Sequence, residues 1–340
     1  MMKKFMNDPN SFVIESLTGM LAAYPGFLCA HPENVKAIFR PQYENKKKVA
    51  IITGGGYGHL PAFVGYVGEG LCDGAAIGSV FSSPSATTIE QVARSVPNEN
   101  GILFLIGNYM GDVMNVELAV EKLTADGIQS AIVTVTDDAA SAPREEWKNR
   151  RGIGGIALIY KIAGSAAKLG KTLSEIVNIT ERAKQHLASY GAAFTSCQLP
   201  STHAPVFEIG SDEMELGIGI HGESGVQRVK IMSSKDIASL MVDKLVCDLS
   251  LKKGDQVAVL LNGLGAASKE ELFLFYHDVH SLLTMYGVNL VRSFVGEYAT
   301  SLEMHGASLS LMKLDKELLL YFDEPAFSPF VHFYGPGKTH

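Results

Sequence analysis

The chain has 340 residues, 46% hydrophobic and 19% charged, a composition typical of a globular protein rather than a disordered one. Its formal net charge of −7 offers no basic face to a nucleic-acid backbone, so we expect no direct nucleic-acid binding. No apolar run reaches the length of about 18 residues that a membrane span needs, and Asp8 and Pro9 interrupt the N-terminal segment where a signal peptide would be apolar. We therefore expect a cytoplasmic protein that does not contact a membrane.

Short apolar runs alternate with helical patterns in the first part of the chain. The runs at 48–55, 101–107 and 130–136 end in glycine or polar turns, which predicts buried strands. The segment 115–126 has helical spacing. Strands alternating with helices predict an α/β sheet, and open sheets of that kind bind ligands at the carboxyl ends of their strands.

Two helices and a change of pattern follow. Residues 154–170 are small or apolar on most faces, which predicts a buried helix. Thr172 and Glu175 form a capping box that opens a helix through about Tyr190. Beyond Gly191, "AFTSCQL" and "VFEIGSDEMELGIGIHGE" alternate apolar and polar residues, which predicts antiparallel strands.

The last part of the chain returns to alternating helices and strands. We expect a helix at about 234–249, a strand at 256–262 and a helix that begins near Ser268, which forms a second capping box with Glu271. The change of pattern places a domain boundary near residue 190, which separates domains at 1–190 and 191–340.

Three polar residues stand beside glycines where strands are predicted to end. They are His59 in "GGGYGHLP", Asp112 in "GNYMGDVMN" and His221 in "GIGIHGESG". A lone histidine usually has a structural role, and an alternative role for Asp112 is to cap the helix that follows it. If the three converge, they supply a nucleophile, a general base and a hydrogen-bonding group for a small polar substrate.

The sequence offers no other cofactor site. The glycine turn at 54–59 matches neither the dinucleotide fingerprint nor the Walker pattern, because His59 stands where each requires glycine. The four cysteines lie far apart and form no C-x-x-C pair. We therefore expect no nucleotide-phosphate loop, no metal site and no disulfide framework.

Several motifs resemble the substrate-binding subunit of dihydroxyacetone kinases, the DhaK family. They are "GGGYGHLPAFVGYVGEG", "IGNYMGDVMN", "RRGIGGIALIYKIAGSAA", "MELGIGIHGESG" and "VGEYATSLEMHGASLSL", and the resemblance runs from about residue 10 to residue 330. It implies an α/β subunit of two domains, each built on a mixed β-sheet with flanking helices, that forms a homodimer.

The resemblance also implies roles for the site residues. His221 would bind the ketone carbon of dihydroxyacetone covalently as a hemiaminal, which selects ketoses over polyols by reactivity. His59 and Asp112 would hydrogen-bond the ligand hydroxyls and activate one of them. The backbone of three glycines would approach the ligand: Gly55, Gly56 and Gly58. The family places the nucleotide and the phosphoryl donor on separate subunits, so we expect no cofactor in this chain.

The sequence departs from the family motifs at four positions of the expected pocket: Tyr57, Leu60, Gly107 and Met110. The family has serine, glutamate, lysine and threonine there. A lysine would stabilise charge that develops during phosphoryl transfer, and losing such a group commonly costs about 2.7–4 kcal/mol of barrier. We expect Tyr57 to crowd an incoming phosphoryl group.

These departures favour a sensor over a catalyst. The sequence is most similar to the DhaQ-type coactivators of the family, which capture dihydroxyacetone and act on transcription with a TetR-like DNA-binding partner. The alternative is a kinase subunit for dihydroxyacetone or another short ketose, which works with separate nucleotide-binding and phosphoryl-donor subunits.

Overall fold

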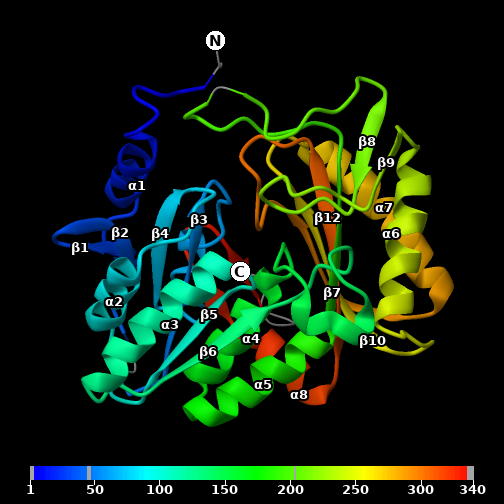
Figure 1. Ribbon diagram of the computed structural model, residues 1–340. Coiled ribbons are helices and arrows are strands. Elements are labelled where there is room, and N and C mark those ends of the chain that lie inside the picture. The colour runs from blue at the N-terminus through cyan, green and yellow to red at the C-terminus, as the bar shows by residue number, and fades with distance from the viewer. Residues whose placement is uncertain (1–3, 44–46, 203, 335–340) are drawn as a thin grey trace.

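A computed structural model of the chain describes residues 4–43, 47–202 and 204–334. It contains two six-stranded mixed sheets, with helices outside each sheet and a layer of helices between them (Figure 1). The expected fold class, two mixed sheets with flanking helices, is confirmed. No helix in the described ranges combines the length and the apolar character needed to cross a bilayer.

The first sheet has the strand order β1-β2-β4-β3-β5-β6. The strands β4, β3, β5 and β6 are parallel, and β1 and β2 add an antiparallel edge. The bounds are β1 (Cys29–His31), β2 (Asn34–Phe39), β3 (Ala50–Tyr57), β4 (Gly74–Val80), β5 (Ile102–Gly107) and β6 (Ser130–Val135). The three strands predicted in this region are confirmed as β3, β5 and β6.

Helices cover both faces of the first sheet. The helices α2 (Ala86–Ser95) and α3 (Met110–Ala125) pack on one face, and α1 (Phe12–Ala23) packs on the other. The predicted helix at 115–126 is therefore confirmed as α3, although it begins five residues earlier. The 3₁₀ turn η1 (Val64–Tyr66) follows β3.

The helical layer between the sheets consists of α4 (Ile156–Lys168), α5 (Leu173–Gln185) and α8 (Lys316–Asp323). Every α4 residue from Ile156 to Ala167 is buried, as the sequence predicts. One apolar core joins this layer to side chains from both sheets, for example Ile51 of β3 and Leu260 from the second sheet. The predicted capping box of Thr172 and Glu175 is present at the start of α5.

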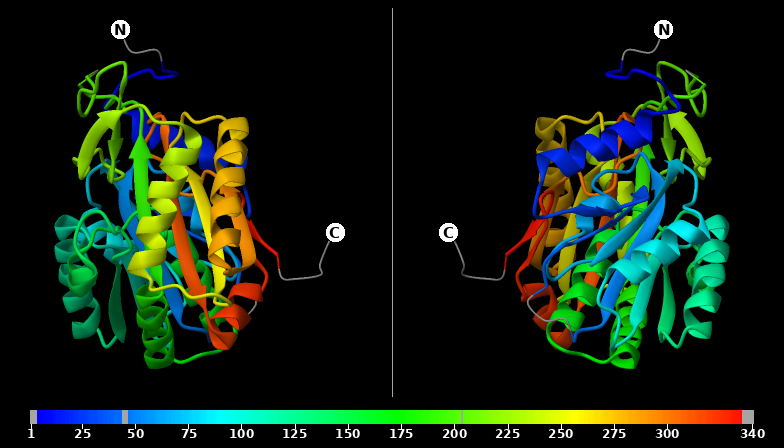
Figure 2. Two further views of the ribbon diagram at one scale, coloured as in Figure 1. Left: turned by 90° about the vertical axis from the view of Figure 1, so that its right-hand side faces the viewer. Right: turned by 90° about the vertical axis from the view of Figure 1, so that its left-hand side faces the viewer.

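The second sheet has the strand order β11-β10-β12-β7-β8-β9, in which only the β10–β11 pair is parallel. The bounds are β7 (Leu187–Ala193), β8 (Glu213–Leu216), β9 (Gln227–Lys230), β10 (Gln256–Gly263), β11 (Asn289–Gly296) and β12 (Gly306–Leu314). Its outer face is covered by α6 (Ser234–Asp248) and α7 (Lys269–Tyr286), which lie side by side in Figure 2. A short pair, β13 (Ala326–Phe327) with β14 (His332–Phe333), follows near the end of the chain.

The structure differs from the sequence expectations around residue 190. The helix α5 ends at Gln185, and β7 takes residues 187–193 into the second sheet, so residue 190 lies inside a strand. Of the antiparallel strands predicted beyond Gly191, β8 is present at 213–216. The described residues of 194–212 form only an isolated bridge between Gln198 and Pro205, because after Ala193 the chain leaves the ladder with β12. One continuous apolar core joins the two sheets and does not divide the chain at residue 190. The domain boundary near residue 190 therefore stays a prediction.

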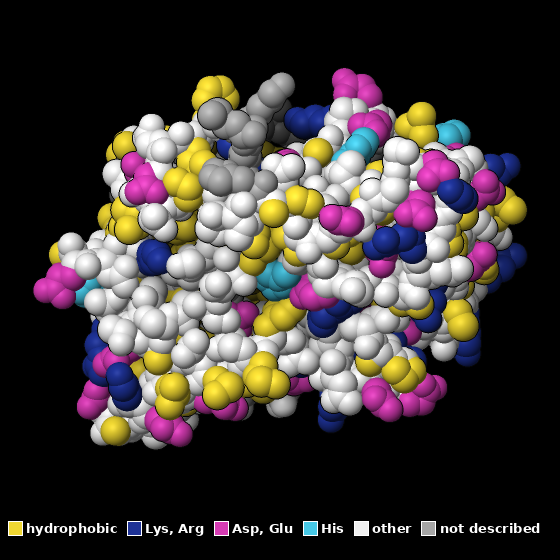
Figure 3. Space-filling view, turned by 45° about the horizontal axis from the view of Figure 1, so that its top comes forward, with side chains coloured by type: hydrophobic (Ala, Val, Ile, Leu, Met, Phe, Trp, Pro, Cys, Tyr) yellow, Lys and Arg dark blue, Asp and Glu magenta, His cyan; other side chains and the backbone are white. Residues whose placement is uncertain are grey.

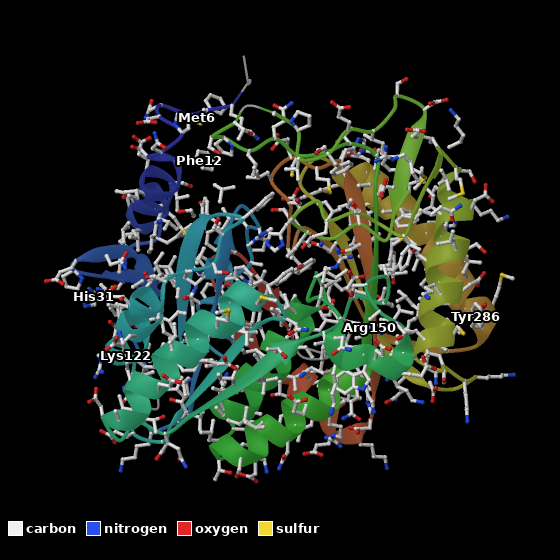
Figure 4. All side chains as sticks on the ribbon, in the orientation of Figure 1. Met6, Phe12, His31, Lys122, Arg150 and Tyr286 are labelled. Carbon is white, nitrogen blue, oxygen red and sulfur yellow. The ribbon has the colours of Figure 1, made fainter. Side chains whose placement is uncertain are left out.

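A buried ion pair connects the segment that precedes α4 to the outer helix α6. Arg150 follows the 3₁₀ segment η2 (Arg144–Asn149) and lies near the middle of the molecule in Figure 4. Its guanidinium donates two hydrogen bonds to the Asp248 carboxylate at the end of α6, at 2.9 and 2.6 Å. Such a bidentate pair fixes geometry as well as charge.

Candidate functional site

Two of the three predicted site residues, His59 and His221, are in ring contact, and the third, Asp112, lies near enough for the charge of His221 to act on its pKa. His59 follows β3, Asp112 lies in α3 just after β5, and His221 lies in the loop between β8 and β9. The ring centroids of His59 and His221 are 4.6 Å apart, with the rings nearly perpendicular. In Figure 3, which brings the top of the view in Figure 1 forward, a histidine surface lies near the middle of the face beside acidic and basic side chains.

His221 is held by an acidic neighbour two residues later. Its Nδ1–H donates to Glu223 Oε1 at 3.0 Å, and its main-chain N–H donates to Glu223 Oε2 at 2.9 Å. Burial works to raise the pKa of Glu223, but the hydrogen bonds and charge of His221 outweigh it and lower that pKa to about 2. In the neutral form of the ring the single proton sits on Nδ1, because Glu223 accepts there, and the free lone pair is on Nε2.

Aromatic rings surround the His221 imidazole. The centroid of the His221 ring lies 4.6 Å from that of Tyr109, 4.6 Å from that of His59 and 5.4 Å from that of Phe81. The Tyr109 hydroxyl donates to the Gly152 carbonyl at 2.9 Å, and burial raises its pKa well above the usual value, so it stays a donor. The His221 side chain is 20% exposed, which leaves it reachable by a small ligand.

His59 is fully buried and neutral. Its Nδ1–H donates to the Thr300 carbonyl at 2.8 Å, and its ring stacks on Phe81 at 4.8 Å. Burial, helped by the charge of His221, lowers the pKa of His59 to about 3. Its Nε2 has no hydrogen-bond partner among the described residues, so an unpaired acceptor lies next to the His221 ring.

Asp112 is a buried carboxyl group in the first turn of α3. The N-cap of this helix is Tyr109, so Asp112 does not take the capping role that was its alternative. Its side chain is buried, and within the part of the chain the structure describes Oδ1 has no hydrogen-bond partner. Burial raises the pKa of Asp112 to about 6, although Ser83 and the charge of His221 act in the opposite direction.

The glycine turn packs tightly against the protein itself. A Cβ on Gly55 would lie 2.1 Å from the Phe63 ring, and one on Gly56 would lie 2.7 Å from the Ser82 amide nitrogen. Gly58 has a φ of +109°, which favours glycine. Packing alone therefore explains these glycines, and their approach to a ligand stays a prediction.

Two of the four departures from the family motifs lie away from the histidines. The Tyr57 ring is 4% exposed, its hydroxyl lies 2.5 Å from Ser16 Oγ on α1, and the Phe12 ring lies 6.2 Å from it between centroids. Tyr57 also lines a cavity of about 330 Å³ with Gly58, Leu60 and Thr300, and its crowding of an incoming phosphoryl group stays a prediction. Met110 is 81% exposed at the start of α3.

The other two departures adjoin the site. The Leu60 carbonyl accepts a hydrogen bond from Thr300 Oγ1 at 2.8 Å. A Cβ on Gly107 would lie 3.1 Å from two ring atoms of Tyr109, which contacts His221. A side chain at position 107 would therefore displace Tyr109 by a few tenths of an ångström.

The sequence reasoning missed three residues of the site: Tyr109, Phe81 and Glu223. Glu223 and Tyr109 stand inside the glycine-flanked motifs, so an acidic group two residues from the histidine was a usable signal. Phe81 carries no local signal, because its φ of +55° and its stacking on His59 arise from the tertiary fold. Among the described residues, no group of three or more His, Cys, Asp or Glu side chains is arranged to hold a metal ion.

Comparison with known proteins gives this site its family. Residues 18–330 match the Dak1 domain. The chain belongs to the Dak1 family. It is 42% identical to a D-erythrulose kinase of Mycolicibacterium smegmatis and 40% identical to an L-erythrulose kinase of Pectobacterium atrosepticum, in each case over 96% of this chain. It spans 56% of the length of each of those proteins.

Two other relatives are similar over nearly their whole length, and a third is similar over part of its length. The dihydroxyacetone-binding subunit of a PTS-dependent dihydroxyacetone kinase of Listeria innocua is 38% identical, with 93% of this chain and 95% of that protein covered. Among solved structures, the dihydroxyacetone kinase operon co-activator Dha-DhaQ is 32% identical at a TM-score of 0.88, with 94% of this chain and 98% of that chain covered. The kinase of C. freundii is 30% identical at the same TM-score, with 100% and 62% covered.

Proposed function

We propose that the chain is the substrate-binding module of a short-ketose kinase and that it holds the ketone as a hemiaminal on His221 Nε2. The observation that carries this proposal is the Glu223 carboxylate on His221 Nδ1, which directs the free lone pair of the imidazole to Nε2. The substrate class is a three- or four-carbon 2-ketose, such as dihydroxyacetone or erythrulose.

The proposed reaction is the addition of an imidazole nitrogen to the ketone carbonyl. Nε2 forms a bond to the ketone carbon while the carbonyl π electrons move to oxygen, which takes up a proton. The ring, now carrying a substituent on Nε2, returns to neutrality by releasing its Nδ1 proton to the solvent, which also supplies the proton of the new hydroxyl group, so no net proton is gained or lost. The Glu223 carboxylate, hydrogen-bonded at Nδ1, stabilises the positive ring before that proton leaves. Glycerol has no electrophilic carbon and is excluded on reactivity.

His59 and Asp112 would handle the hydroxyl groups of the bound ketose. His59 donates through Nδ1 to Thr300, so its unpaired Nε2 accepts a hydrogen bond from a ligand hydroxyl. Asp112 has a pKa of about 6, and near neutral pH its carboxylate is suited to take the proton of the hydroxyl that attacks the phosphoryl donor. A buried carboxylate with a raised pKa and one oxygen without a hydrogen-bond partner is typical of a catalytic site.

The motif departures favour a coactivator, but the named sequence relatives favour a kinase. Curated relatives named as ketose kinases or kinase subunits reach 38–42% identity, although among solved structures the coactivator and the C. freundii kinase are about equally distant, at 32% and 30%. We propose that the phosphoryl donor comes from a nucleotide-binding or phosphoryl-donor module outside the Dak1 domain, and that two copies of the chain form a dimer.

A second candidate is a ketose-sensing coactivator that acts with a TetR-like DNA-binding protein. Two observations favour it: the overlap with Dha-DhaQ and glycine at position 107, where the family motif has lysine. In this case the ketose adduct would stabilise one conformation of the chain and thereby alter partner binding.

One assay separates the two candidates. The chain is mixed with L-erythrulose or dihydroxyacetone and with the nucleotide-binding and phosphoryl-donor subunits of the Listeria innocua relative, and the sugar phosphate is measured. We expect product from at least one ketose. No product from either ketose, together with an intact adduct on His221, would support the coactivator, and Gly107→Lys would then be expected to restore some transfer.

A further inference from the structure

A cavity of about 220 Å³ lies on the outer face of the second sheet, away from His221. It is bounded by the end of β7, the start of β12, the residues that lead into α6 and the first turns of α7. Most of its lining side chains are apolar, and they include Phe194, Ile231, Met232, Ile237, Leu272 and Phe275.

The walls of this cavity provide few free hydrogen-bonding groups for water. Ala192 and Ala307 are partners in the β7–β12 ladder, and the Ser234 hydroxyl donates to Asp278 at 2.7 Å. An apolar cavity of about 150 Å³ in another protein stays dry and binds benzene, so one of 220 Å³ has room for a two-ring molecule. Apolar pockets with a few polar groups are the usual form of a ligand site.

One end of the cavity is polar. His305 Nε2 lies 2.9 Å from Glu271 Oε1, and the edge of the His305 ring meets Phe194 at 5.4 Å. Glu271 also completes the capping box at the start of α7, which fixes its carboxylate in place. A carboxylate at the polar end favours a ligand with an N–H or O–H donor and repels an anion.

The segment 300–306 connects this cavity to the ketose site. At one end the Thr300 carbonyl accepts from His59 Nδ1, and the Leu302 amide donates to the Gly58 carbonyl at 2.8 Å. At the other end the His305 carbonyl accepts from the Phe194 amide at 2.7 Å, and both residues line the cavity. The same seven-residue segment therefore contacts both the cavity and the backbone that holds His59.

We propose that this cavity binds a small uncharged molecule, mainly apolar and carrying one hydrogen-bond donor, and that its occupancy changes the ketose affinity of the chain. The binding part goes beyond the proposed function, and the coupling part rests on it.

Binding is tested on the intact chain by calorimetry and ligand-observed NMR with three probes: indole, 1-methylindole and toluene. We expect saturable binding of indole, with about fivefold weaker binding of 1-methylindole because it lacks the N–H donor. No saturable binding by any of the three probes would overturn the proposal.

Two neighbouring residues of α7 provide a matched pair of variants. Leu274 lines the cavity, whereas Phe273 is not among its lining residues, and the two are 59% and 58% exposed. Leu274→Asp is expected to abolish indole binding and Phe273→Asp to retain it. Equal loss in both variants would contradict binding in this cavity, and both positions are exposed enough for the variants to fold.

Coupling is tested by titrating the ketose with and without saturating indole. We expect its dissociation constant to change by about fivefold or more, and the ketose to change indole affinity by the same factor, since linkage is reciprocal. An unchanged ketose affinity would overturn the coupling. A chain that binds indole but no ketose contradicts the proposed function and upholds the cavity.

Discussion

The reactivity of this site depends on which nitrogen of His221 is free, and Glu223 decides it. The carboxylate accepts from both Nδ1 and the main-chain N–H of the same residue, so it fixes the tautomer and the ring orientation together. Sequence reasoning identified the histidine from its glycine neighbours but not this partner. Local motifs indicate which residue types are near one another and leave the hydrogen bonds between them to the folded loop.

Replacing Glu223 tests this role. We expect Glu223→Gln to weaken ketose binding by about 10- to 150-fold, because hydrogen bonds to charged groups contribute about 1.5–3 kcal/mol. The measurement is a ketose titration by NMR. Glu208→Gln, an exposed position in the same part of the chain, should leave the affinity unchanged, and an unchanged affinity in Glu223→Gln would contradict the role.

Asp112 should set the pH dependence of phosphoryl transfer. Burial raises its pKa to about 6, so the carboxylate is ionised above that pH and protonated below it. Transfer should therefore decline as the pH falls through about 6, and Asp112→Asn should lower the rate by about 10²–10⁴ while the adduct persists. Glu117→Gln, exposed on the same helix, is the control; a rate in Asp112→Asn equal to that of the control would exclude Asp112 as the base.

At the scale of elements, local capping signals predicted helix starts well. The boxes at Thr172 and Ser268 are both formed, and they need only residues three apart in the sequence. The predicted end of α5 was wrong by five residues, because the residues that follow Gln185 form β7, which pairs with β12 more than a hundred residues away. Long-range pairing of this kind leaves no local signal.

The packing of α4 against α8 contains a buried lysine that should make stability depend on pH. Lys161 is fully buried, and its Nζ donates to Ser165 Oγ and the Tyr321 carbonyl. Burial lowers the pKa of Lys161 from 10.5 to about 7. Between these values the unfolded chain binds the proton and the folded chain does not, so this residue raises stability as the pH rises, by up to about 1.4 kcal/mol per pH unit.

Lys161→Met should remove that slope. Urea denaturation at pH 7, 8 and 9 gives the unfolding free energy of the protein and of the variant. The value for the unmodified protein minus that for the variant should increase as the pH rises. Lys244→Met, at an exposed position on α6, is the control. A difference that stays constant over this range would contradict the pKa shift of Lys161.

At the scale of the whole molecule, the site depends on both sheets. His59 and Asp112 follow strands of the first sheet, whereas His221 follows β8 of the second, and the inner helices hold the sheets together through one core. The sequence predicted that these residues would lie at strand ends, but their convergence across two sheets required the resemblance to a known family. The contact of the Tyr57 hydroxyl with Ser16 on α1 was not predictable, because the two residues are some forty positions apart and meet only when α1 packs against β3 in the fold.

The central claim is a covalent bond between His221 Nε2 and a ketone carbon. It is tested most directly by carbon-13 NMR of the intact chain with dihydroxyacetone labelled at the carbonyl carbon. We expect the bound ketose to lose its carbonyl signal and gain a tetrahedral one, which is absent in His221→Ala. Bound ketose that keeps its carbonyl signal, or a tetrahedral signal that persists in His221→Ala, would contradict the account.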